Sequence, residues 1–414
     1  MSLYEELQYR GMIKDVSNET LAKDALDNKK VRFYCGFDPS GDSLTVGHLV
    51  QVIRIRLLQK YGHTAIVLIG GATGLIGDPK MTSERKLLTL ENSLNNAEKI
   101  KKQLEDLLKN TEQTIFVNNY DWLKDINLIS FLRDYGKYFS INYMLSKDVV
   151  QRRLETGISY TEFSYMLLQS IDWLYLYEKY NCLIQFGGSD QWGNITSGLE
   201  LIKKKSGHED AIGLSSPLLL KADGEKFGKS ESGALFLDKN LTSAYEVYQY
   251  FLNTRDSDLE TYFKVLTLLP KEEINNLIEN NNLNSSERLA QKRLASEIVL
   301  FLHGEAELDN AIRISNNFFN GDFDNLTSED FSNIVKTIPS TTIEDNSNIL
   351  DVLVESKLSI SKREAREFID NGSISLGQEK VTSVNFLISK SNSYFSKYQV
   401  LRRGKKKFQV IIIK

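Results

Sequence analysis

Two short segments, far apart in the chain, combine the residue types that hold phosphate groups. The first follows the apolar run at 31–37, continues through Asp38-Pro-Ser-Gly41 and reaches Thr45-Val-Gly-His48. A strand, a tight turn and a helix N-terminus in this order present free backbone N–H groups to an anion, and glycines let a ligand approach the backbone. The second, Lys226-Phe-Gly-Lys-Ser230, puts two cations and a hydroxyl in a polar loop. Either segment alone is a weak signal, because many such turns bind nothing and most charged loops are solvated, but the pair indicates a nucleotide site.

A third group of polar residues lies along one predicted helix. Tyr165, Gln169 and Asp172 are spaced i, i+4 and i+7, so they share one stripe of that helix. Ser159 and Glu162 have the spacing of a capping box at its start. Nearly all other residues of the helix are apolar or aromatic, and a buried helix carries a polar stripe when the stripe lines a wet or ligand-filled pocket. The alternative is a stripe that faces solvent or an internal hydrogen-bond partner.

The elements that position these residues are predicted by hydrophobic patterning. Short apolar runs at 31–37, 65–70, 114–118 and 182–187 have the composition of strands, with helical stretches between them. This alternation predicts an α/β fold with a doubly wound, Rossmann-like parallel sheet. An aromatic and aliphatic segment at about 120–145 is interpreted as an insertion that connects the two halves of the sheet.

Length and composition restrict the class of protein. A chain of 414 residues is too long for one typical core, so we expect two or three domains. Cys35 and Cys182 lie in strand-like apolar runs and are expected to be reduced thiols. The first residues contain no apolar signal region and no apolar run has membrane-spanning length, so we expect a cytoplasmic protein without a membrane association. Four histidines and two cysteines show no metal-ligand spacing, so we expect no protein-held metal.

The second half of the chain differs from the first in pattern and charge. Helical periodicity runs through 243–252, 271–279 and 286–303, and a polar, acidic stretch at 321–345 has the composition of a linker. Residues 346–414 hold 13 basic and 6 acidic residues, a net charge of +7, whereas the whole chain has −4 and the remainder therefore −11. A basic segment on an acidic body indicates a module that binds a polyanion.

The two phosphate-type segments resemble the signature motifs of class I aminoacyl-tRNA synthetases, usually written HIGH and KMSKS. Their flanking sequences resemble bacterial tyrosyl-tRNA synthetases, essentially from end to end. Four stretches carry this resemblance: Tyr34-Cys-Gly-Phe-Asp-Pro39, Gly74-Leu-Ile-Gly-Asp-Pro79, Tyr165-Met-Leu-Leu-Gln-Ser-Ile-Asp172 and Gln185-Phe-Gly-Gly-Ser-Asp-Gln-Trp-Gly-Asn194. The resemblance implies activation of L-tyrosine with ATP, followed by transfer of tyrosine to the 3′ end of tRNA(Tyr).

The resemblance also implies a tyrosine pocket. Tyr34 and Asp172 would hydrogen-bond the phenolic hydroxyl of the substrate. Asp78, Tyr165 and Gln169 would surround its α-ammonium, for which a carboxylate is the natural counter-charge. Gln191 would help to hold its carboxylate. Without the resemblance, Asp78 in Gly-Asp-Pro is interpreted as a turn residue.

For ATP, the resemblance places His48 at the phosphates and ribose, and Gly47 where adenine approaches the backbone. Asp190 and Gly188 would bind the ribose hydroxyls, and Cys35 would lie near the ribose or, equally well, be a small core residue. Leu218 and Leu219 would flank adenine. The first motif would supply the remaining ATP contacts: Gly36, Asp38, Ser40 and Thr45.

The implied chemistry needs no covalent protein intermediate. The substrate carboxylate attacks the α-phosphate of ATP, and catalysis comes from positioning and charge stabilisation. The catalytic group would be His48 together with Lys226, Lys229 and Ser230, of which the lysines face the leaving pyrophosphate. Magnesium would arrive with the phosphates rather than in a protein cage.

The resemblance finally implies partners and domains. The insertion would contribute to a homodimer interface, and the division would be a catalytic domain at 1–235, an α-helical tRNA-binding domain at 236–320, a linker at 321–345 and a small α+β RNA-binding domain at 346–414. The tail cations assigned to tRNA are Lys362, Arg363, Arg366, Arg402, Arg403, Lys405, Lys406 and Lys407.

Two departures and several alternatives qualify this interpretation. Thr45 replaces the first histidine of the family motif, and the loop after Pro79 is one residue shorter than usual, so the family's phosphate contacts carry over less completely there than those of the tyrosine pocket. The alternatives are a tryptophanyl-tRNA synthetase, a catalytically silent RNA-binding relative and a nucleotidylyltransferase of the same superfamily. Tyr34 with Asp172 suits a phenol rather than an indole. A silent scaffold would not need His48, Asp190 and the loop lysines.

Overall fold

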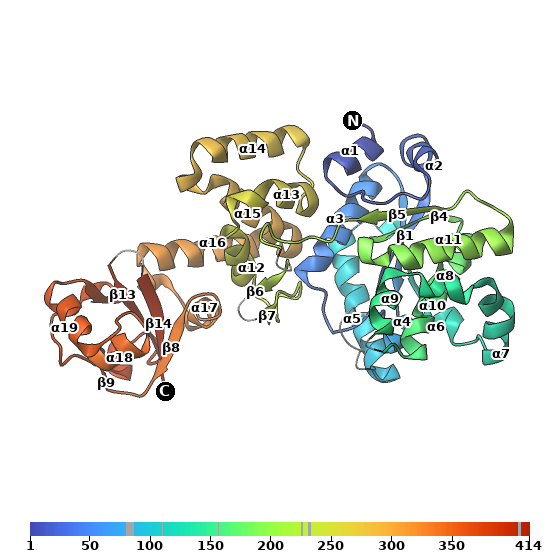
Figure 1. Cartoon of the computed structure of the whole chain (residues 1–414). Helices are drawn as coiled ribbons and strands as arrows, with labels where there is room; N and C mark the ends of the chain where they lie inside the picture. The colour runs from blue at the N-terminus through green and yellow to red at the C-terminus, as the bar shows by residue number, and fades with distance from the viewer. Residues whose placement is uncertain (80–86, 110, 156, 225–226, 231–232, 405–406) are drawn as a thin grey trace. The chain divides into compact units, whose positions relative to one another are not determined.

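The computed structural model describes residues 1–79, 87–109, 111–155, 157–224, 227–230, 233–404 and 407–414 (Figure 1). Within this part, the chain divides into two compact units. The first comprises 1–238 and 255–290, and the second comprises 239–254 and 291–414.

The first unit is built on a five-stranded parallel sheet. In chain order the strands are β1 (Arg32–Phe37), β2 (Thr64–Ile69), β3 (Thr114–Asn118), β4 (Cys182–Gly188) and β5 (Ile212–Ser216). Their order in the sheet is β3-β2-β1-β4-β5, and every neighbouring pair is parallel. The doubly wound α/β prediction is confirmed, and four strands coincide closely with the predicted runs. The patterning missed β5, which is fully buried but has only two large apolar residues, Ile212 and Leu214.

The strand order places a ligand crevice at one point of the sheet. From β1 the chain builds outward to β2 and β3, and it then returns to the other side of β1 to add β4 and β5. The connections that follow β1 and β4 therefore leave the sheet in opposite directions, which opens a crevice beyond the carboxyl ends of these strands. The first phosphate-type segment follows β1, and the segment at 185–194 spans the end of β4.

Helices cover the sheet on both faces. The long ones are α3 (Val46–Lys60), α5 (Leu90–Leu108), α10 (Tyr160–Tyr180) and α11 (Trp192–Ser206). Strand alternation sends neighbouring residues of β1 to opposite faces: Tyr34 packs edge-on against Trp173 of α10, whereas Cys35 contacts Arg54 of α3. The sheet thus separates a core shared with α10 and α11 from one shared with α3.

Helix α10, which carries the polar stripe, begins where the sequence predicts. Ser159 caps it by accepting a hydrogen bond from the backbone N–H of Glu162 at 3.3 Å. The expected reciprocal bond from a capping box does not form, because the Glu162 carboxylate pairs instead with the buried guanidinium of Arg153 at 2.7 Å. The local spacing could not reveal this competing cation, which precedes the helix in α9 (Asp148–Leu154).

Short elements complete the first unit. The connecting segment at 120–145 forms α6 (Tyr120–Leu123), α7 (Leu128–Ser130), η3 (Phe131–Tyr135), η4 (Gly136–Tyr138) and α8 (Ile141–Leu145). At the N-terminus lie α1 (Leu3–Tyr9), α2 (Glu19–Lys23) and η1 (Asp24–Asn28), and α4 (Thr73–Ile76) follows β2. The buried Arg10 guanidinium donates to the backbone carbonyls of Lys264, Thr267 and Leu269 at 2.8–2.9 Å, which ties α13 (Asp256–Leu266) and the turn before α14 (Lys271–Leu283) to this unit.

The second unit contains the other helices of the expected helical region, namely α12 (Ala244–Leu252), α15 (Leu289–His303) and α16 (Glu305–Asn320). The expected linker at 321–345 also has structure here. It contains α17 (Ser328–Ile334), which Thr327 caps and which buries Phe331 and Ile334 completely, and β8 (Ser340–Ile343). The composition predicted a linker because the stretch is mostly polar. Its few apolar residues are buried by residues far away in the sequence, which the local composition does not show.

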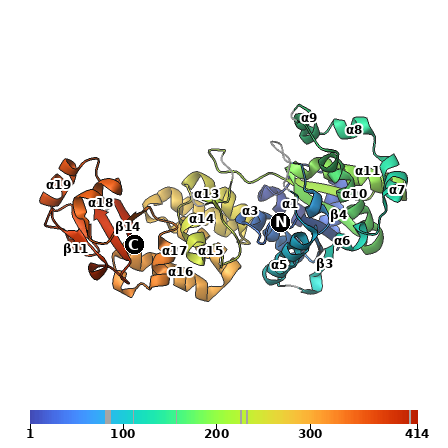
Figure 2. The same cartoon turned by 90° about the horizontal axis from the view of Figure 1, so that it is seen from below.

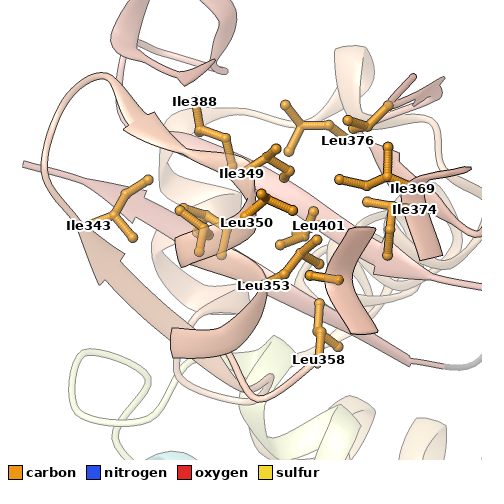
Figure 3. Packing of buried hydrophobic residues seen from close by; sticks show 14 of the residues in the cluster. Ile343, Ile349, Leu350, Leu353, Leu358, Ile369, Ile374, Leu376, Ile388 and Leu401 are labelled. Atoms are coloured by element: carbon orange, nitrogen blue, oxygen red, sulfur yellow. The ribbon is translucent and has the colours of Figure 1, made fainter. Parts of the chain in front are cut away.

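The C-terminal part of this unit is a mixed sheet with two helices. Its strand order is β11-β10-β13-β14-β8, formed by β10 (Ile374–Leu376), β11 (Glu379–Lys380), β13 (Tyr398–Arg403), β14 (Lys407–Ile413) and β8, with β9 (Ser347–Asn348) and β12 (Leu387–Ile388) as a separate pair. Figures 1 and 2 show α18 (Ile349–Glu355) and α19 (Lys362–Asp370) side by side. They bury an aliphatic core against the sheet (Figure 3), in which Ile349, Ile374 and Leu401 have no exposed surface. No helix in the described ranges is long and apolar enough to cross a membrane.

Candidate active site

A pocket of about 300 Å³ lies at the crevice between β1 and β4. Most of the residues predicted for substrate binding line it together: Tyr34, Gly36, Asp38, Ser40, His48, Asp78, Tyr165, Gln169, Asp172, Gly188, Asp190, Gln191 and Leu218. They come from six different places in the chain, and the sheet brings them to one point. The lining also includes residues that the sequence did not single out, among them Gln51, Thr73, Gln185 and Phe186.

Asp172 forms one end of the pocket and is held by two donors. The side-chain amide of Asn119 donates to its Oδ2 at 2.9 Å, and the indole N–H of Trp122 donates to its Oδ1 at 2.8 Å. Burial raises the pKa of Asp172 to about 7, against the lowering effect of these two hydrogen bonds. A carboxylate has about four acceptor positions, so each oxygen retains one for a further donor.

Tyr34 lies beside Asp172 at the same end. Its hydroxyl is buried and has no hydrogen-bond partner in the described structure. Burial raises the pKa of Tyr34 well above its ordinary value, and the nearby charge of Asp172 adds to this shift. A buried hydroxyl without a partner is costly, so this end of the pocket is suited to a ligand that brings a hydrogen-bonding group of its own.

Asp78 forms the centre of a second polar cluster. It accepts hydrogen bonds from the amides of Gln191 at 2.8 Å and Asn194 at 3.1 Å. Asn194 also donates to the side-chain oxygen of Gln169 at 3.0 Å. Burial raises the pKa of Asp78 to about 6, although both amides act to lower it. A partly buried carboxylate in a pocket is suited to a cationic ligand group.

One hydrogen-bond network links Asp172 to Asp38 and Tyr165. The hydroxyl of Tyr165 donates to Asp38 at 2.7 Å, and the hydroxyl of Thr73 donates to the other oxygen of Asp38 at 2.8 Å. Asn119, which holds Asp172, donates to that same Thr73 hydroxyl at 2.9 Å. Asp38, which the sequence analysis assigned to ATP, therefore lies beside Tyr165, which that analysis assigned to tyrosine.

His48 also lines the pocket, and a backbone hydrogen bond sets its tautomer. The backbone N–H of Thr45 donates to His48 Nδ1 at 3.1 Å, so Nδ1 is an acceptor and the ring proton is on Nε2. Burial lowers the pKa of His48. The ring therefore offers a neutral N–H donor at neutral pH. The Thr45 hydroxyl lies 3.1 Å from the same Nδ1 and Thr45 does not line the pocket, so Thr45 contacts His48 instead of the pocket interior.

Glycines at the end of β4 keep the pocket open. A Cβ atom on Gly188 would lie 2.5 Å from Asp190 Oδ1 and 3.4 Å from Leu218. Leu218 lines the pocket, whereas Leu219 lines a neighbouring cavity of about 390 Å³. Cys35 is a buried free thiol behind the pocket wall and is not among the lining residues.

The two phosphate-type segments meet in space. Gly228 has φ = +80° and packs against the start of α3, where a Cβ atom would lie 2.8 Å from Val46 and 3.5 Å from the backbone nitrogen of Gly47. The backbone N–H of Val46 donates to the carbonyl of Leu235, and that of Leu235 donates to Gly228. Glycine is required at 228 by both its conformation and its surroundings. Gly228, which lies between Lys226 and Lys229 in the sequence, therefore packs beside the start of the helix that carries His48.

The loop lysines themselves are described only in part. Lys229 and Ser230 form the short strand β6, which pairs with β7 (Gly233–Ala234). Lys226 lies outside the described residues, as do Lys80 and Arg85 in the loop after Pro79. Among the residues that are described, no cluster of His, Cys, Asp and Glu has the arrangement of a metal site.

The basic residues of the tail have different surroundings. Arg366 and Arg363 are exposed on α19, as is Lys362, which pairs with Asp351. Arg402 donates to the carbonyl of Phe318 and lies over the ring of Phe323, while Arg403 stacks on Phe368 at 4.1 Å. Both arginines of β13 are thus partly committed to contacts inside the unit. Lys407 is exposed, and Lys405 and Lys406 lie outside the described residues.

Four residues that organise the site were missed by the sequence reasoning: Thr73, Asn119, Trp122 and Asn194. Asn194 stood at the end of a quoted motif and was a missed signal. Asn119 follows β3 immediately. Its position at the carboxyl end of a parallel strand, where ligands bind in such folds, was a signal that could have found it. Thr73 and Trp122 had no distinctive spacing, because their roles depend on partners about 35 to 50 residues away.

The chain matches two known families. The family described as "tRNA synthetases class I (W and Y)" covers residues 26–320, and the "Tyrosine--tRNA ligase SYY-like C-terminal domain" covers residues 330–411. The "Tyrosine--tRNA ligase" of Onion yellows phytoplasma is 52% identical over 413 residues, which is 100% of both chains. This chain belongs to the tyrosine–tRNA ligase family of class I synthetases. The recognition made from the sequence motifs is confirmed.

Further relatives agree with this assignment. The "Tyrosine--tRNA ligase" of Staphylococcus haemolyticus is 46% identical over 99% of each chain. The crystal structure of a C-terminally truncated mitochondrial tyrosyl-tRNA synthetase from Aspergillus nidulans superposes with a TM-score of 0.69 at 33% identity, over 77% of this chain and 94% of that one. The fold of the first unit is thus that of a class I synthetase.

Proposed function

We propose that this protein is a tyrosine–tRNA ligase, which activates L-tyrosine with ATP and transfers it to the 3′ end of tRNA(Tyr). The observation that carries this proposal is the pair of hydrogen-bonded carboxylates that line one pocket, the buried Asp172 and the partly buried Asp78. Asp172, which accepts from one amide and one indole N–H, suits a phenolic hydroxyl. Asp78 suits an ammonium group. The family assignment and the relatives that span the whole chain support the same conclusion.

In this proposal tyrosine lies between the two carboxylates. Its hydroxyl donates to Asp172 and accepts from Tyr34, which gives the unpaired Tyr34 hydroxyl a partner. Its ammonium lies among Asp78, Tyr165 and Gln169, and Gln191 is positioned beside its carboxylate. An indole has one donor and no acceptor, so tryptophan would leave the Tyr34 hydroxyl unpaired.

ATP occupies the half of the pocket that contains His48, Gly188 and Asp190. The neutral Nε2–H of His48 donates toward the phosphates, and Asp190 accepts from ribose hydroxyls. Lys226, Lys229 and Ser230 stabilise the charge of pyrophosphate as it leaves. Gly228, their neighbour in the sequence, packs beside the start of α3. Magnesium accompanies the phosphates and neutralises part of their charge when bound. The protein is inferred to act in the cytoplasm.

The experiment that tests the proposed function is amino-acid-dependent exchange of pyrophosphate into ATP. We expect exchange with tyrosine and none above background with tryptophan. Charging of tRNA(Tyr) with radiolabelled tyrosine should follow in the same preparation. Exchange with tryptophan instead would support the alternative enzyme, and a folded protein that binds tRNA without any exchange would support a silent relative.

Tyrosine activation should decline on acidification. Ionised Asp172 and Asp78 are the forms that accept from the phenol and pair with the ammonium, and their pKa values in the free protein are about 7 and about 6. Both groups become protonated as the pH falls from 8 to 5.5, so kcat/KM for tyrosine should fall through this range. The measurement is a pH profile of exchange at limiting tyrosine and saturating ATP. In Asp172→Asn the upper of the two inflections should disappear, and its persistence would contradict the assignment.

We further propose a homodimer formed through the connecting segment. Three large apolar residues of this segment are highly exposed: Leu128 by 69%, Ile129 by 67% and Ile141 by 60%. Side chains of this kind that gather in one segment are typical of an interface. We expect Ile129→Asp to shift the protein toward monomers in sedimentation equilibrium. Leu283→Asp, which changes a residue outside the segment that is even more exposed (78%), should leave the dimer intact. A wild-type protein that is monomeric at every concentration would contradict this proposal.

A further inference from the structure

Helix α3 contains a buried arginine that the roles proposed above do not use. Arg54 is 1% exposed. Its Nη1 donates to the hydroxyl of Ser216 at 2.8 Å, and its Nη2 lies 3.8 Å from the sulfur of Cys35. The guanidinium carbon lies 3.9 Å from the centre of the Phe186 ring, and Nε has no hydrogen-bond partner.

No carboxylate forms an ion pair with Arg54 in the part of the chain that the structure describes. The other deeply buried arginines differ in this respect: Arg10 pairs with Glu6 at 3.0 Å, and Arg153 pairs with Glu162 at 2.7 Å. A buried charge without a counter-charge is costly for the folded state. The contacts with Phe186, Ser216 and Cys35 offset part of this cost, but they supply no negative charge.

The position of Arg54 relates it to the nucleotide half of the pocket. The Phe186 ring under its guanidinium lines the pocket, and so do His48 and Gln51 on the same helix. Gln51 also has a buried side-chain oxygen without a partner. The Ser216 hydroxyl that accepts from Arg54 donates to the carbonyl of Gly187, which lines the pocket as well. Arg54 therefore lies immediately behind the pocket wall on the nucleotide side.

We propose that Arg54 is a built-in counter-charge for the phosphates of the bound nucleotide, acting across the pocket wall without touching them. This inference rests on the proposed function, because it takes the ligand of this half to be ATP. A polyphosphate brings the negative charge that the buried guanidinium lacks, and the low polarity of the surroundings lets the attraction act over a longer distance than in water. Arg54 is thus a residue that determines affinity for the charged part of ATP.

The competing explanation is that Arg54 only holds the wall in place. In that case its loss would disturb Phe186, Cys35 and Ser216, and any ligand of this half would bind more weakly, whatever its charge. Ligands that share the adenosine group but differ in phosphate content separate the two explanations. Adenosine has no phosphate, AMP has one and ATP has three.

The test measures binding of adenosine, AMP and Mg·ATP to full-length wild-type protein, Arg54→Met and Arg54→Lys by titration calorimetry. In Arg54→Met we expect ATP affinity to fall about tenfold, the scale for one unit-charge pair across about 10 Å of protein. AMP affinity should fall less, and adenosine affinity should stay within about twofold. Arg54→Lys retains the charge and should keep most of the ATP affinity.

Two controls accompany these variants. Arg56→Met removes a cation two residues further along α3, where it donates to the carbonyl of Leu108, and it should leave all three affinities unchanged. Tyrosine affinity and the thermal unfolding midpoint report whether each variant is folded. Equal losses for adenosine and ATP, an unchanged ATP affinity in Arg54→Met, or an Arg54→Lys as weak as Arg54→Met would each overturn the proposal. A wild-type protein that binds no ATP would instead contradict the proposed function.

Discussion

Replacing Asp172 by alanine is expected to remove most of the preference for tyrosine over phenylalanine. The carboxylate is 2% exposed, lines the pocket and is the acceptor that we propose for the phenolic hydroxyl. A hydrogen bond to a charged group contributes a factor on the order of 10 to 100 in binding affinity. A substrate hydroxyl that is buried without a partner adds a desolvation cost. We expect kcat/KM for tyrosine in pyrophosphate exchange to fall about a hundredfold. Phenylalanine lacks the hydroxyl, so its kcat/KM should change little.

The network around Asp172 provides a graded comparison. Asn119→Ala removes one of the two donors that orient the carboxylate but leaves the carboxylate in place. We expect a smaller loss for tyrosine in this variant, about tenfold. In both variants ATP affinity and the unfolding midpoint monitor the rest of the fold. Wild-type selectivity in Asp172→Ala would show that another group recognises the phenol.

Reversing the charge of two tail arginines is expected to separate activation from tRNA charging. Arg363 and Arg366 lie one helical turn apart on the exposed side of α19, and Arg366 has no ion pair in the described structure. In the double variant Arg363→Glu/Arg366→Glu, pyrophosphate exchange should stay at the wild-type level, because the residues that we propose to bind tyrosine and ATP in the pocket lie in the first unit. The KM for tRNA should rise at least about tenfold at moderate salt, since phosphate contacts dominate such affinities.

Salt dependence identifies the mechanism of that loss. Each phosphate contact contributes a slope of about 0.7–0.9 in a plot of log affinity against log salt concentration. Loss of two contacts should therefore flatten the slope by about 1.5. The control Lys99→Glu/Lys102→Glu makes the same charge change at the same spacing on α5 and should leave charging unaffected. An unchanged tRNA affinity in the tail variant would remove this face of α19 from RNA recognition.

Point variants are preferred to deletion of the tail for a structural reason. Strand β8 at Ser340–Ile343 pairs with β14, and Phe318 of α16 packs against Phe408 of β14. A deletion from 346 onward would leave β8 without its partner and would expose Phe318, which is 1% exposed in the intact chain. Loss of charging after deletion would then combine lost contacts with a damaged core.

Local sequence patterns were sufficient for the features that depend on near neighbours. The apolar runs predicted four of the five strands of the parallel sheet, and the i, i+4, i+7 stripe predicted that Tyr165, Gln169 and Asp172 share one wall of a pocket. Ser159 was correctly placed as the N-cap of α10. These features follow from backbone periodicity and from one-turn hydrogen bonds, which the sequence displays directly.

Only the tertiary structure decided which polar groups meet. Asp38 follows β1 like the other phosphate-type residues, but its hydrogen bonds with Tyr165 and Thr73 make it part of the network that leads through Asn119 to Asp172. Asn119 and Trp122, which hold Asp172, precede it in the sequence by 53 and 50 residues. Residues 321–345 form structure because Phe331 stacks on Tyr394 and Tyr398, which lie some 60 residues later. Contacts of this separation are produced by the order of strands and the packing of cores, and no local spacing encodes them.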